Sequence, residues 1–333
     1  MRKIVATALV LGLLAGSFVF AGGGSEKASG DVKEVTYKLA HSYQPTHAFS
    51  KGVKRLIDVV KQKSNGKFII NEFPAAQLGS EKDITDGAVN GVIEMVIIGP
   101  GEIGKRYKPV LIFEGPFLFS GYEHAQKVLK GPVGRDLWDG CLKATGLREL
   151  ATLYYGTRYV TAKKAIRTPE DMKGMKLRAP DMPMSVANAR AMGANPTPMA
   201  LSEVYLALQQ NVVDGQENPI PTIYTQKFFE VQSHIIMTGH VFQVTPLFVG
   251  DKKFQALSPE FRKILTDSVD QVAPTIDREI MDDEKKMLEE MKSRGMQVIQ
   301  PDVAAFVKAT SSVYKDFESN WGPDLYNKIQ ALR

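Results

Sequence analysis

A helical pattern of unusual length constrains the fold of this chain more than any other feature of its sequence. It begins at Ser258-Pro259-Glu260, where a capping serine, a proline and an acid mark a first helical turn, and it continues to Gly295. At about 1.5 Å per residue, a helix of about 35 residues extends ~50 Å, which exceeds the diameter of one small domain. We therefore expect this helix to run across two domains. Pro274 lies inside the pattern, so we also expect a bend there.

The rest of the chain alternates short strand patterns with helical patterns. Residues 35–40, 67–73 and 92–98 are typical of strands, whereas residues 48–63 and 80–89 between them have helical patterns. This alternation predicts an α/β fold in which helices connect parallel strands.

Two segments far apart in the chain are similar to each other. Residues 80–94 and 202–214 each begin with Ser-Glu, continue as a helical pattern to an asparagine, and end in an aliphatic pair followed by an acid. In each, the serine can cap the first turn and the glutamate favours the positive end of the helix dipole. Two like units in a chain of this length suggest two like domains.

The N-terminal residues indicate the compartment. Two basic residues precede an apolar run from Ile4 to Phe20, and Ala21 is a small residue of the kind that a signal peptidase recognises. A membrane anchor is the alternative, but it usually needs ~20 apolar residues, and this run is shorter and is followed by glycines. We expect a signal peptide over residues 1–21, cleaved near Ala21, a flexible leader over 22–34, and a periplasmic location.

The composition argues against several kinds of partner. The formal net charge is +5, and basic and acidic residues alternate without a basic stripe, so nothing indicates nucleic-acid binding. The single cysteine, Cys141, has no second thiol in the chain to pair with. We expect the mature chain to be a soluble monomer without a cofactor.

Sequence motifs of enzymes are missing or lack the right context. Residues 99–104, GPGEIG, have the spacing of a dinucleotide site, but residues 105–109 lack the helical pattern that such a site needs. We interpret them as a glycine-rich loop at the carboxyl edge of the sheet. The five histidines lack metal-ligand spacing, and no G-x-S-x-G motif occurs. We therefore predict a binding protein without catalytic residues or a metal.

Two arginines stand in apolar, strand-like segments. Arg158 lies in YYGTRYV and Arg178 lies in MKLRAP. A guanidinium presents a rigid fork of donors that suits a carboxylate. The alternative is a structural ion pair with an acid such as Asp214 or Glu217, and the residues alone favour neither interpretation.

The segment Val213–Pro219, VDGQENP, collects polar side chains after a predicted strand. Asp-Gly and Asn-Pro form turns readily, so we expect a turn here. Gln216 or Asn218 can then direct an amide toward a ligand at the carboxyl ends of the strands, where open α/β sheets bind.

Several stretches together resemble the periplasmic binding subunits of tripartite ATP-independent (TRAP) transporters, the DctP-like family. The most specific stretch is residues 195–219, NPTPMALSEVYLALQQNVVDGQENP, and KFFEVQ at 227–232 continues it. PAAQLG at 74–79 and MKGMKLR at 172–178 also match. The resemblance covers nearly the whole mature chain.

The resemblance implies a two-lobed α/β periplasmic binding protein of the type II-like clamshell class, with strands and a long helix that cross between the lobes. On this pattern we expect the first lobe to span 35–155 with 244–283, and the second to span 156–243 with 284–333. The implied function is to capture a small organic carboxylate and deliver it to the integral membrane subunits of a TRAP permease.

The same resemblance implies the site. Arg178 matches the arginine that binds the ligand carboxylate, Arg158 matches a second arginine, and Asn218 matches the amide beside it. Three further candidate ligand-binding residues match pocket positions of the sialic-acid-binding members, and these are Ser42, Glu81 and Leu201. His41, the residue before Ser42, is the remaining candidate.

Two positions depart from the sialic-acid-binding members. Gly99 stands where those members have an acid, and Leu201 stands where they have an aromatic residue. We therefore expect a sugar acid such as a uronate, a keto-gulonate or a sialic acid, or another hydroxy acid. A C4-dicarboxylate or 2-oxoacid ligand, a ligand-presenting partner of a membrane sensor, and an exported enzyme on the same scaffold are the alternatives.

Overall fold

Strand β1 (Val35–Ala40) lies near the start of residues 33–333, which are the residues that the computed structural model describes. The predicted signal peptide and nearly all of the predicted leader lie outside them. Within residues 33–333, every helix is either too short or too polar to cross a membrane.

The strands of these residues form one mixed sheet in the order β2-β1-β3-β8-β4-β7-β5-β6, with β9 paired to β8. Pairs at the two ends of the order are parallel, whereas β8 is antiparallel to β3 and β4. The predicted parallel sheet is therefore correct for the ends and wrong for the middle. The strands after β1 are β2 (Phe68–Phe73), β3 (Met95–Ile97), β4 (Leu147–Ala162), β5 (Lys176–Ala179), β6 (Asn195–Pro198), β7 (Gly215–Pro219), β8 (His234–Gly250) and β9 (Gln297–Ile299).

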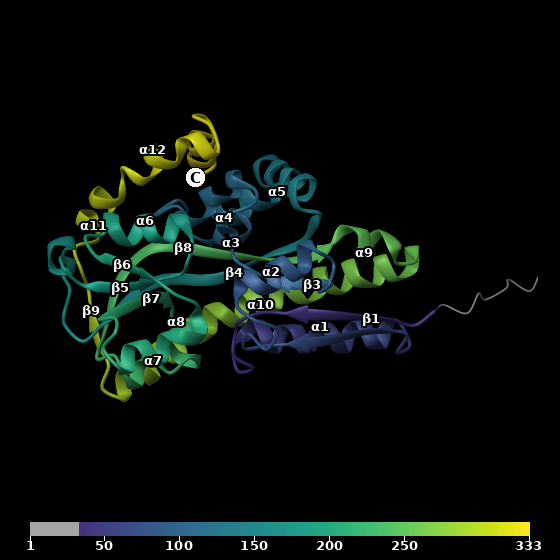
Figure 1. The fold of residues 1–333 in the computed structure, drawn as a ribbon, viewed down its shortest axis with the longest axis horizontal. Coiled ribbons are helices and arrows are strands. Elements are labelled where there is room, and N and C mark those ends of the chain that lie inside the picture. The colour runs from purple at the N-terminus through teal and green to yellow at the C-terminus, as the bar shows by residue number, and fades with distance from the viewer. Residues whose placement is uncertain (1–32) are drawn as a thin grey trace, which may run out of the picture. The chain divides into compact units, whose positions relative to one another are not determined.

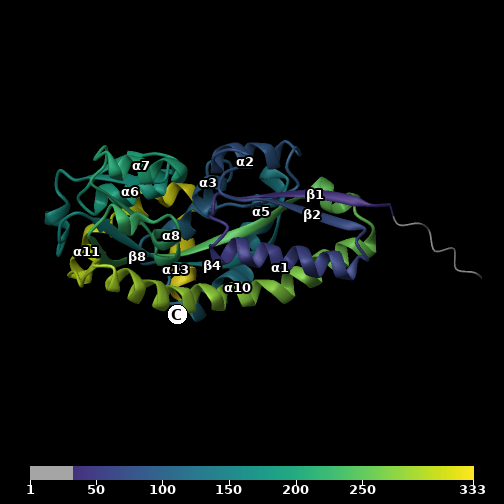
Figure 2. The same ribbon diagram turned by 90° about the horizontal axis from the view of Figure 1, so that it is seen from below.

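Helices cover both faces of this sheet. Figures 1 and 2 show α1 and α10 on one side of it and α2, α3 and α7 on the other. The helices of the described residues are α1 (Ala48–Lys63), α2 (Glu81–Val89), α3 (Pro100–Ile103), α4 (Tyr122–Lys130), α5 (Pro132–Thr145), α6 (Pro183–Ala191), α7 (Val204–Gln209), α8 (Ile220–Thr225), α9 (Asp251–Ala256), α10 (Pro259–Ser293), α11 (Val303–Thr310), α12 (Val313–Phe317) and α13 (Leu325–Gln330).

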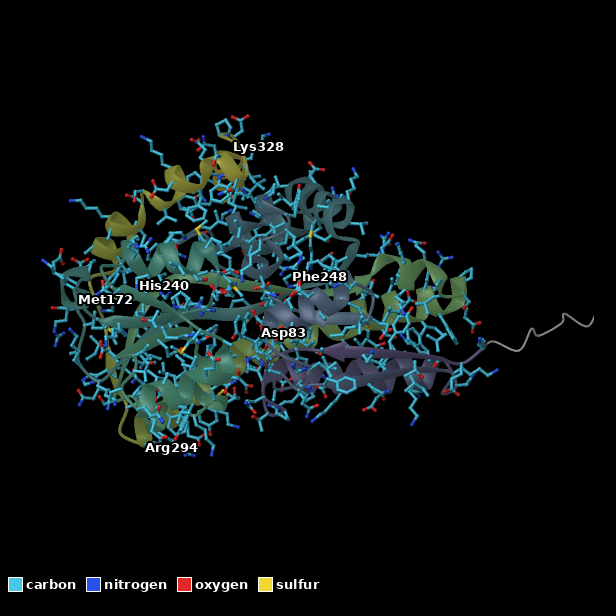
Figure 3. All side chains as sticks on the ribbon, viewed as in Figure 1. Asp83, Met172, His240, Phe248, Arg294 and Lys328 are labelled. Atoms are coloured by element: carbon cyan, nitrogen blue, oxygen red, sulfur yellow. The ribbon has the colours of Figure 1, made fainter. Side chains whose placement is uncertain are left out.

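Strands β4 and β8 are long enough to belong to both ends of the sheet, and they pair over most of their length. Separate hydrophobic cores lie along them. One core contains Phe248 and Trp138, a second contains Met172, and a third contains Phe228. Figure 3 labels Phe248 and Met172, which lie well apart along the sheet. The chain thus has two lobes connected by β4, β8 and α10, in agreement with the predicted fold class.

Helix α10 confirms the long helical pattern. It has 35 residues, and the hydroxyl of Ser258 caps it by accepting a hydrogen bond from the backbone N–H of Phe261 at 3.1 Å. The helix passes through Pro274 without interruption. It packs against α1 in one lobe, against β4, and against α8 in the other lobe, and Figure 2 shows it along the lower side of both.

Two carboxylates of α10 hold β4 at the point where the strand passes between the lobes. Asp277 Oδ1 accepts a hydrogen bond from the backbone N–H of Tyr154 at 2.9 Å, and Glu284 Oε1 accepts one from Thr157 at 2.9 Å. Between these two amides the register with β8 shifts, and Gly156 adopts a φ of 120°. The bulge at Gly156 is therefore fixed from the side by α10.

Gly156→Ala should destabilise the protein by about 1 to 3 kcal/mol, because the left-handed backbone strains a residue with a Cβ. A Cβ there would also lie 2.7 Å from the Cβ of Pro219 and 3.0 Å from Glu284 Oε1. Chemical denaturation measures the change. Gly250→Ala is the matched control, since its φ is −60° and its Cβ would meet nothing closer than 3.8 Å. Equal stability of the two variants would contradict the prediction.

The last helices of the chain, α12 and α13, contact residues that the sequence assigned to the first lobe. Ile329 belongs to the core that contains Phe248, and its carbonyl oxygen lies 2.9 Å from His124 Nε2. The hydroxyl of Tyr314 donates to the carbonyl of Pro116 at 2.7 Å. We therefore propose that residues 313–333 belong to the first lobe, in place of the predicted assignment of 284–333 to the second.

Candidate ligand-binding site

A cavity of about 470 Å³ lies among residues from both lobes. Its volume falls within the range of ~300–1,000 Å³ that is usual for small-molecule sites. Six of the seven residues predicted from the sequence line it, and these are Ser42, Glu81, Arg158, Arg178, Leu201 and Asn218. His41 does not line it.

Arg178 lies in β5 with its side chain on the face opposite the hydrophobic core. Its neighbours Leu177 and Ala179 are buried in that core, and the alternation of a strand places Arg178 on the other side. Its Nε and Nη2 donate to the carbonyl oxygen of Met199 at 3.2 and 2.8 Å. Among residues 33–333, no carboxylate lies within ion-pair distance of it. The cavity is thus lined by a buried guanidinium without a counter-ion in contact.

The environment of Arg178 lowers its pKa but leaves it charged. Burial lowers the pKa to about 10, while the charges of Glu217 and Glu81 act in the opposite direction. At neutral pH the side chain is therefore still a cation. A buried cation of this kind favours an anionic ligand, because its own solvation has been lost.

Arg158 forms a structural ion pair with Glu217, which is one of the two alternatives that the sequence left open. Its Nη2 donates to Oε1 of Glu217 at 2.8 Å, and its Nε also donates to that carboxylate. Its Nη1 donates to the side chain of Gln243 at 3.3 Å. The other candidate partner, Asp214, is exposed and instead accepts from the backbone N–H of Lys176. Arg158 thus lines the cavity with its charge already balanced.

Glu217 is held as an anion in a buried site. Burial by itself raises its pKa, but the charge of Arg158 and the hydrogen bonds from His240 and Arg158 lower it to about 2. The distance from His240 Nε2 to Glu217 Oε2 is 3.1 Å. The ion pair is therefore a fixed part of the lobe junction.

The predicted turn at residues 213–219 is wrong for residues 215–219, which form strand β7. This strand pairs with β4 and β5, and all five of its residues are buried. The polar side chains satisfy one another there, since Asn218 donates to Gln216 at 2.6 Å and Gln216 donates to Thr161 at 3.0 Å. Asn218 lines the cavity and Gln216 does not.

Carboxyl groups line the cavity from the first lobe. Glu81 is the first residue of α2, whose N-terminus is fixed by a reciprocal capping box between Ser80 and Asp83. Burial, together with the charges of Glu102 and Glu114, raises the pKa of Glu81 to about 7. The cavity therefore contains guanidinium groups and acids together.

Ser42 and His41 are neighbours with different surroundings. The hydroxyl of Ser42 is buried and has no hydrogen-bond partner among residues 33–333. His41 is buried outside the cavity, with Nε2 3.0 Å from Glu72 Oε1 and with Nδ1 accepting from the backbone N–H of Tyr43 at 3.2 Å. We propose that His41 fixes the loop while Ser42 and Tyr43 contact the ligand.

Comparison with known proteins identifies the family. The model of bacterial extracellular solute-binding proteins, family 7, matches residues 39–320. The chain belongs to this family. The resemblance to the DctP-like group is thereby confirmed.

Family 7 relatives are similar over most of this chain. The sialic acid-binding periplasmic protein SiaP of Vibrio cholerae serotype O1 is 33% identical over 84% of this chain and 87% of its own length. The 2,3-diketo-L-gulonate-binding periplasmic protein YiaO of Escherichia coli K12 is 32% identical over 89% of this chain and 92% of its own. A TRAP periplasmic solute-binding protein from Polaromonas sp. JS666, solved with D-erythronate, has a TM-score of 0.85 and 32% identity, over 90% of this chain and 99% of that one.

Several cavity residues of this family 7 protein were missed by the sequence analysis. Tyr43 and Tyr155 line the cavity with their ring centroids 5.1 Å apart in an edge-on contact. Tyr155 is three residues before Arg158, and the bulge at Gly156 brings both to the cavity. The isolated glycine in the strand-like run YYGTRYV was a local signal for that bulge. Glu114 had a detectable signal, since it is an acid within the apolar run VLIFEGPF.

Proposed function

We propose that this chain is the periplasmic solute-binding protein of a TRAP transporter. It binds a hydroxylated monocarboxylate, a sugar acid, in the cavity between its lobes and delivers it to the membrane permease without changing it chemically. The observation on which this depends is Arg178, a buried guanidinium that lines the cavity with no carboxylate of the described chain in contact.

The charge of the site favours a ligand with one carboxylate. Glu217 already neutralises Arg158, so Arg178 is the guanidinium whose charge is left for a ligand. A ligand carboxylate supplies the missing anion and accepts a bidentate pair of hydrogen bonds, which offsets the loss of its own hydration. Asn218 lies within 3.3 Å of Arg158 Nη2 and offers a further amide beside these groups.

The acids of the first lobe favour hydroxyl groups on the rest of the ligand. Glu81, Glu102 and Glu114 line the same cavity, and although burial raises the pKa of Glu81 to about 7 and raises that of Glu114, those groups that are ionised repel a second ligand carboxylate. Hydroxyls can instead donate to carboxylate oxygens, which are strong acceptors. This supports a sugar acid over a C4-dicarboxylate. The three relatives described above agree in their names, because sialic acid, 2,3-diketo-L-gulonate and D-erythronate are all hydroxylated monocarboxylates.

A thermal-shift screen tests the proposal. We expect aldonates and uronates, such as D-gluconate, L-galactonate and D-galacturonate, to raise the melting temperature, whereas succinate and the neutral hexoses leave it unchanged. A ligand at about 100 times its Kd adds about 2.7 kcal/mol to the free energy of unfolding, which corresponds to a shift on the order of 5 °C.

The screen has two informative failures. A shift with glucose or galactose but with no acid would mean that Arg178 does not bind a carboxylate. A shift with succinate alone would favour the dicarboxylate alternative and would require the acids of the first lobe to be protonated or turned away.

A further inference from the structure

Glu114 is a buried acid that the proposed binding of the carboxylate does not use. It ends a 3-10 helix, Lys108–Glu114, inside an otherwise apolar segment, and its side chain is enclosed between the lobes. It lines both the main cavity and a small neighbouring one of about 10 Å³. A buried carboxyl group is costly without a compensating interaction, so its presence needs an explanation.

The structure fixes one oxygen of Glu114 and leaves the other open. Oε1 accepts a hydrogen bond from the backbone N–H of Gly101 at 3.0 Å and another from Gln243 Nε2 at 2.7 Å. Oε2 has no hydrogen-bond partner among residues 33–333, and it is not among their fully enclosed unpaired atoms. The carboxyl group is therefore oriented, and its Oε2 is unpaired and not fully enclosed in a side chain that lines the cavity.

Glu114 is not needed as a counter-ion. The adjacent guanidinium of Arg158 is already paired with Glu217, and Gln243 separates it from Glu114 by accepting from Arg158 Nη1 at 3.3 Å while donating to Glu114. The position of the backbone is also fixed, since Asn188 of α6 donates to the carbonyl oxygen of Glu114 at 3.0 Å. These contacts hold an acceptor in place without an internal group to bind at Oε2.

Gly99 leaves space in the cavity beside the Glu114 carboxyl group. Its φ is −72°, which any residue can adopt, so the backbone does not require glycine there. A Cβ at Gly99 would have one atom within 4 Å, namely Oε1 of Glu114 at 3.6 Å. A longer side chain would therefore lie against the Glu114 carboxyl group. The glycine-rich segment at residues 99–104, which we interpreted as a loop at the edge of the sheet, thus contributes an open position to the cavity.

From this geometry we infer that Glu114 is a specificity-determining residue, which accepts a hydrogen bond from a ligand hydroxyl through Oε2, and that Gly99 leaves the space for that hydroxyl. The pair selects hydroxylated acids over deoxy acids of the same carbon skeleton. The inference depends on the proposed function, because it assigns a role within the same site.

A cycle of protein and ligand changes tests this inference. Three aldonates, D-gluconate, L-galactonate and D-erythronate, are titrated by calorimetry beside derivatives that each lack one hydroxyl, L-fuconate being the 6-deoxy form of L-galactonate. For the wild type we expect one hydroxyl whose removal weakens binding by about tenfold or more, because hydrogen bonds to charged groups are strong. In Glu114→Gln that hydroxyl should lose most of its effect, while the other hydroxyls keep theirs.

Two further variants complete the test, one as a second probe of the same preference and one as a control. Gly99→Leu keeps the Glu114 carboxyl group itself and should abolish the same tenfold preference by filling the space beside it. Glu149→Gln is the matched control, since Glu149 is a partly buried acid outside the cavity, bonded to Thr152. It should leave every affinity unchanged.

The outcomes separate the two proposals. If the wild type binds neither the three aldonates nor any other sugar acid of the thermal-shift screen, the proposed function itself is contradicted. If the wild type binds them and both Glu114→Gln and Gly99→Leu preserve the preference for every hydroxyl, the function stands and the role of Glu114 is overturned.

Discussion

Arg178→Ala is expected to weaken the binding of an aldonate such as D-gluconate by on the order of a hundredfold or more, about 3 kcal/mol. The reason is that Arg178 is the guanidinium without an internal carboxylate in contact, so the ligand meets its uncompensated charge. The same change should not lower the stability of the ligand-free protein by a comparable amount, because removing a buried, unpaired charge also removes its desolvation cost. Calorimetric titration and thermal unfolding measure the two effects separately.

Two control variants accompany Arg178→Ala, one at the same position and one at an arginine outside the cavity. Arg178→Lys keeps the charge but loses the planar fork, so its affinity should fall between those of the wild type and Arg178→Ala. Arg148→Ala removes an arginine that pairs with Asp251 outside the cavity, and it should leave the affinity unchanged. Wild-type affinity in Arg178→Ala would refute the assignment of the ligand carboxylate to this residue.

Glu217→Gln should have the largest effect on stability, a loss of about 3 to 5 kcal/mol in the free energy of unfolding. The substitution leaves the charge of Arg158 buried without its partner, and it also removes the carboxylate that lies 3.1 Å from His240. A binding consequence follows from the same geometry. Once Arg158 is unpaired, a ligand carboxylate can neutralise it, so the stabilisation by a saturating aldonate should be greater in Glu217→Gln than in the wild type.

The pH dependence provides an independent check on Glu217. Its pKa in the folded protein is about 2, below the ordinary value of 4.5. A depressed carboxyl pKa stabilises the folded state above the unfolded value, and this contribution disappears as the pH falls from 4.5 toward 2. Glu217→Gln should therefore lose less stability than the wild type over this interval, as measured by denaturant unfolding at a series of pH values.

A double substitution distinguishes a broken ion pair from general damage. Replacing both Arg158 and Glu217 by leucine removes the unpaired charge, so much of the stability lost in Glu217→Gln should return. Asp267→Asn breaks the exposed pair with Lys263 and should cost no more than about 1 kcal/mol. If Glu217→Gln were as mild as this exposed control, the ion pair would not be a structural element of the lobe junction.

Sequence analysis predicted the elements whose signals are local. The Ser258 cap and the continuous helical pattern after it predicted α10, and strands β1 and β2 were placed to within one residue. Such features depend on contacts within a few residues, so the segment itself contains the information. Membership of family 7 could also be recognised from the linear motifs, and with it the likeness of Arg178 to a ligand-binding arginine.

The structure corrected the predictions that depend on distant partners. Residues 215–219 were predicted as a turn from their Asp-Gly and Asn-Pro pairs, yet pairing with β4 and β5 makes them a buried strand. The antiparallel middle of the sheet likewise follows from β8, which is more than 130 residues from β3 along the chain. Local turn preferences are weak compared with the hydrogen bonds and burial that a neighbouring strand provides.

The sequence by itself thus determined that this chain is a two-lobed binding protein of family 7 with arginines as its chemically distinctive residues. Only the tertiary structure decided that Arg158 is neutralised by Glu217 while Arg178 is not, and that Glu114 reaches the cavity beside Gly99. The physical reason is that charge balance and cavity lining depend on which side chains come into contact. Each of these contacts joins segments that are far apart in the chain, and the local sequence of one segment does not indicate its partner.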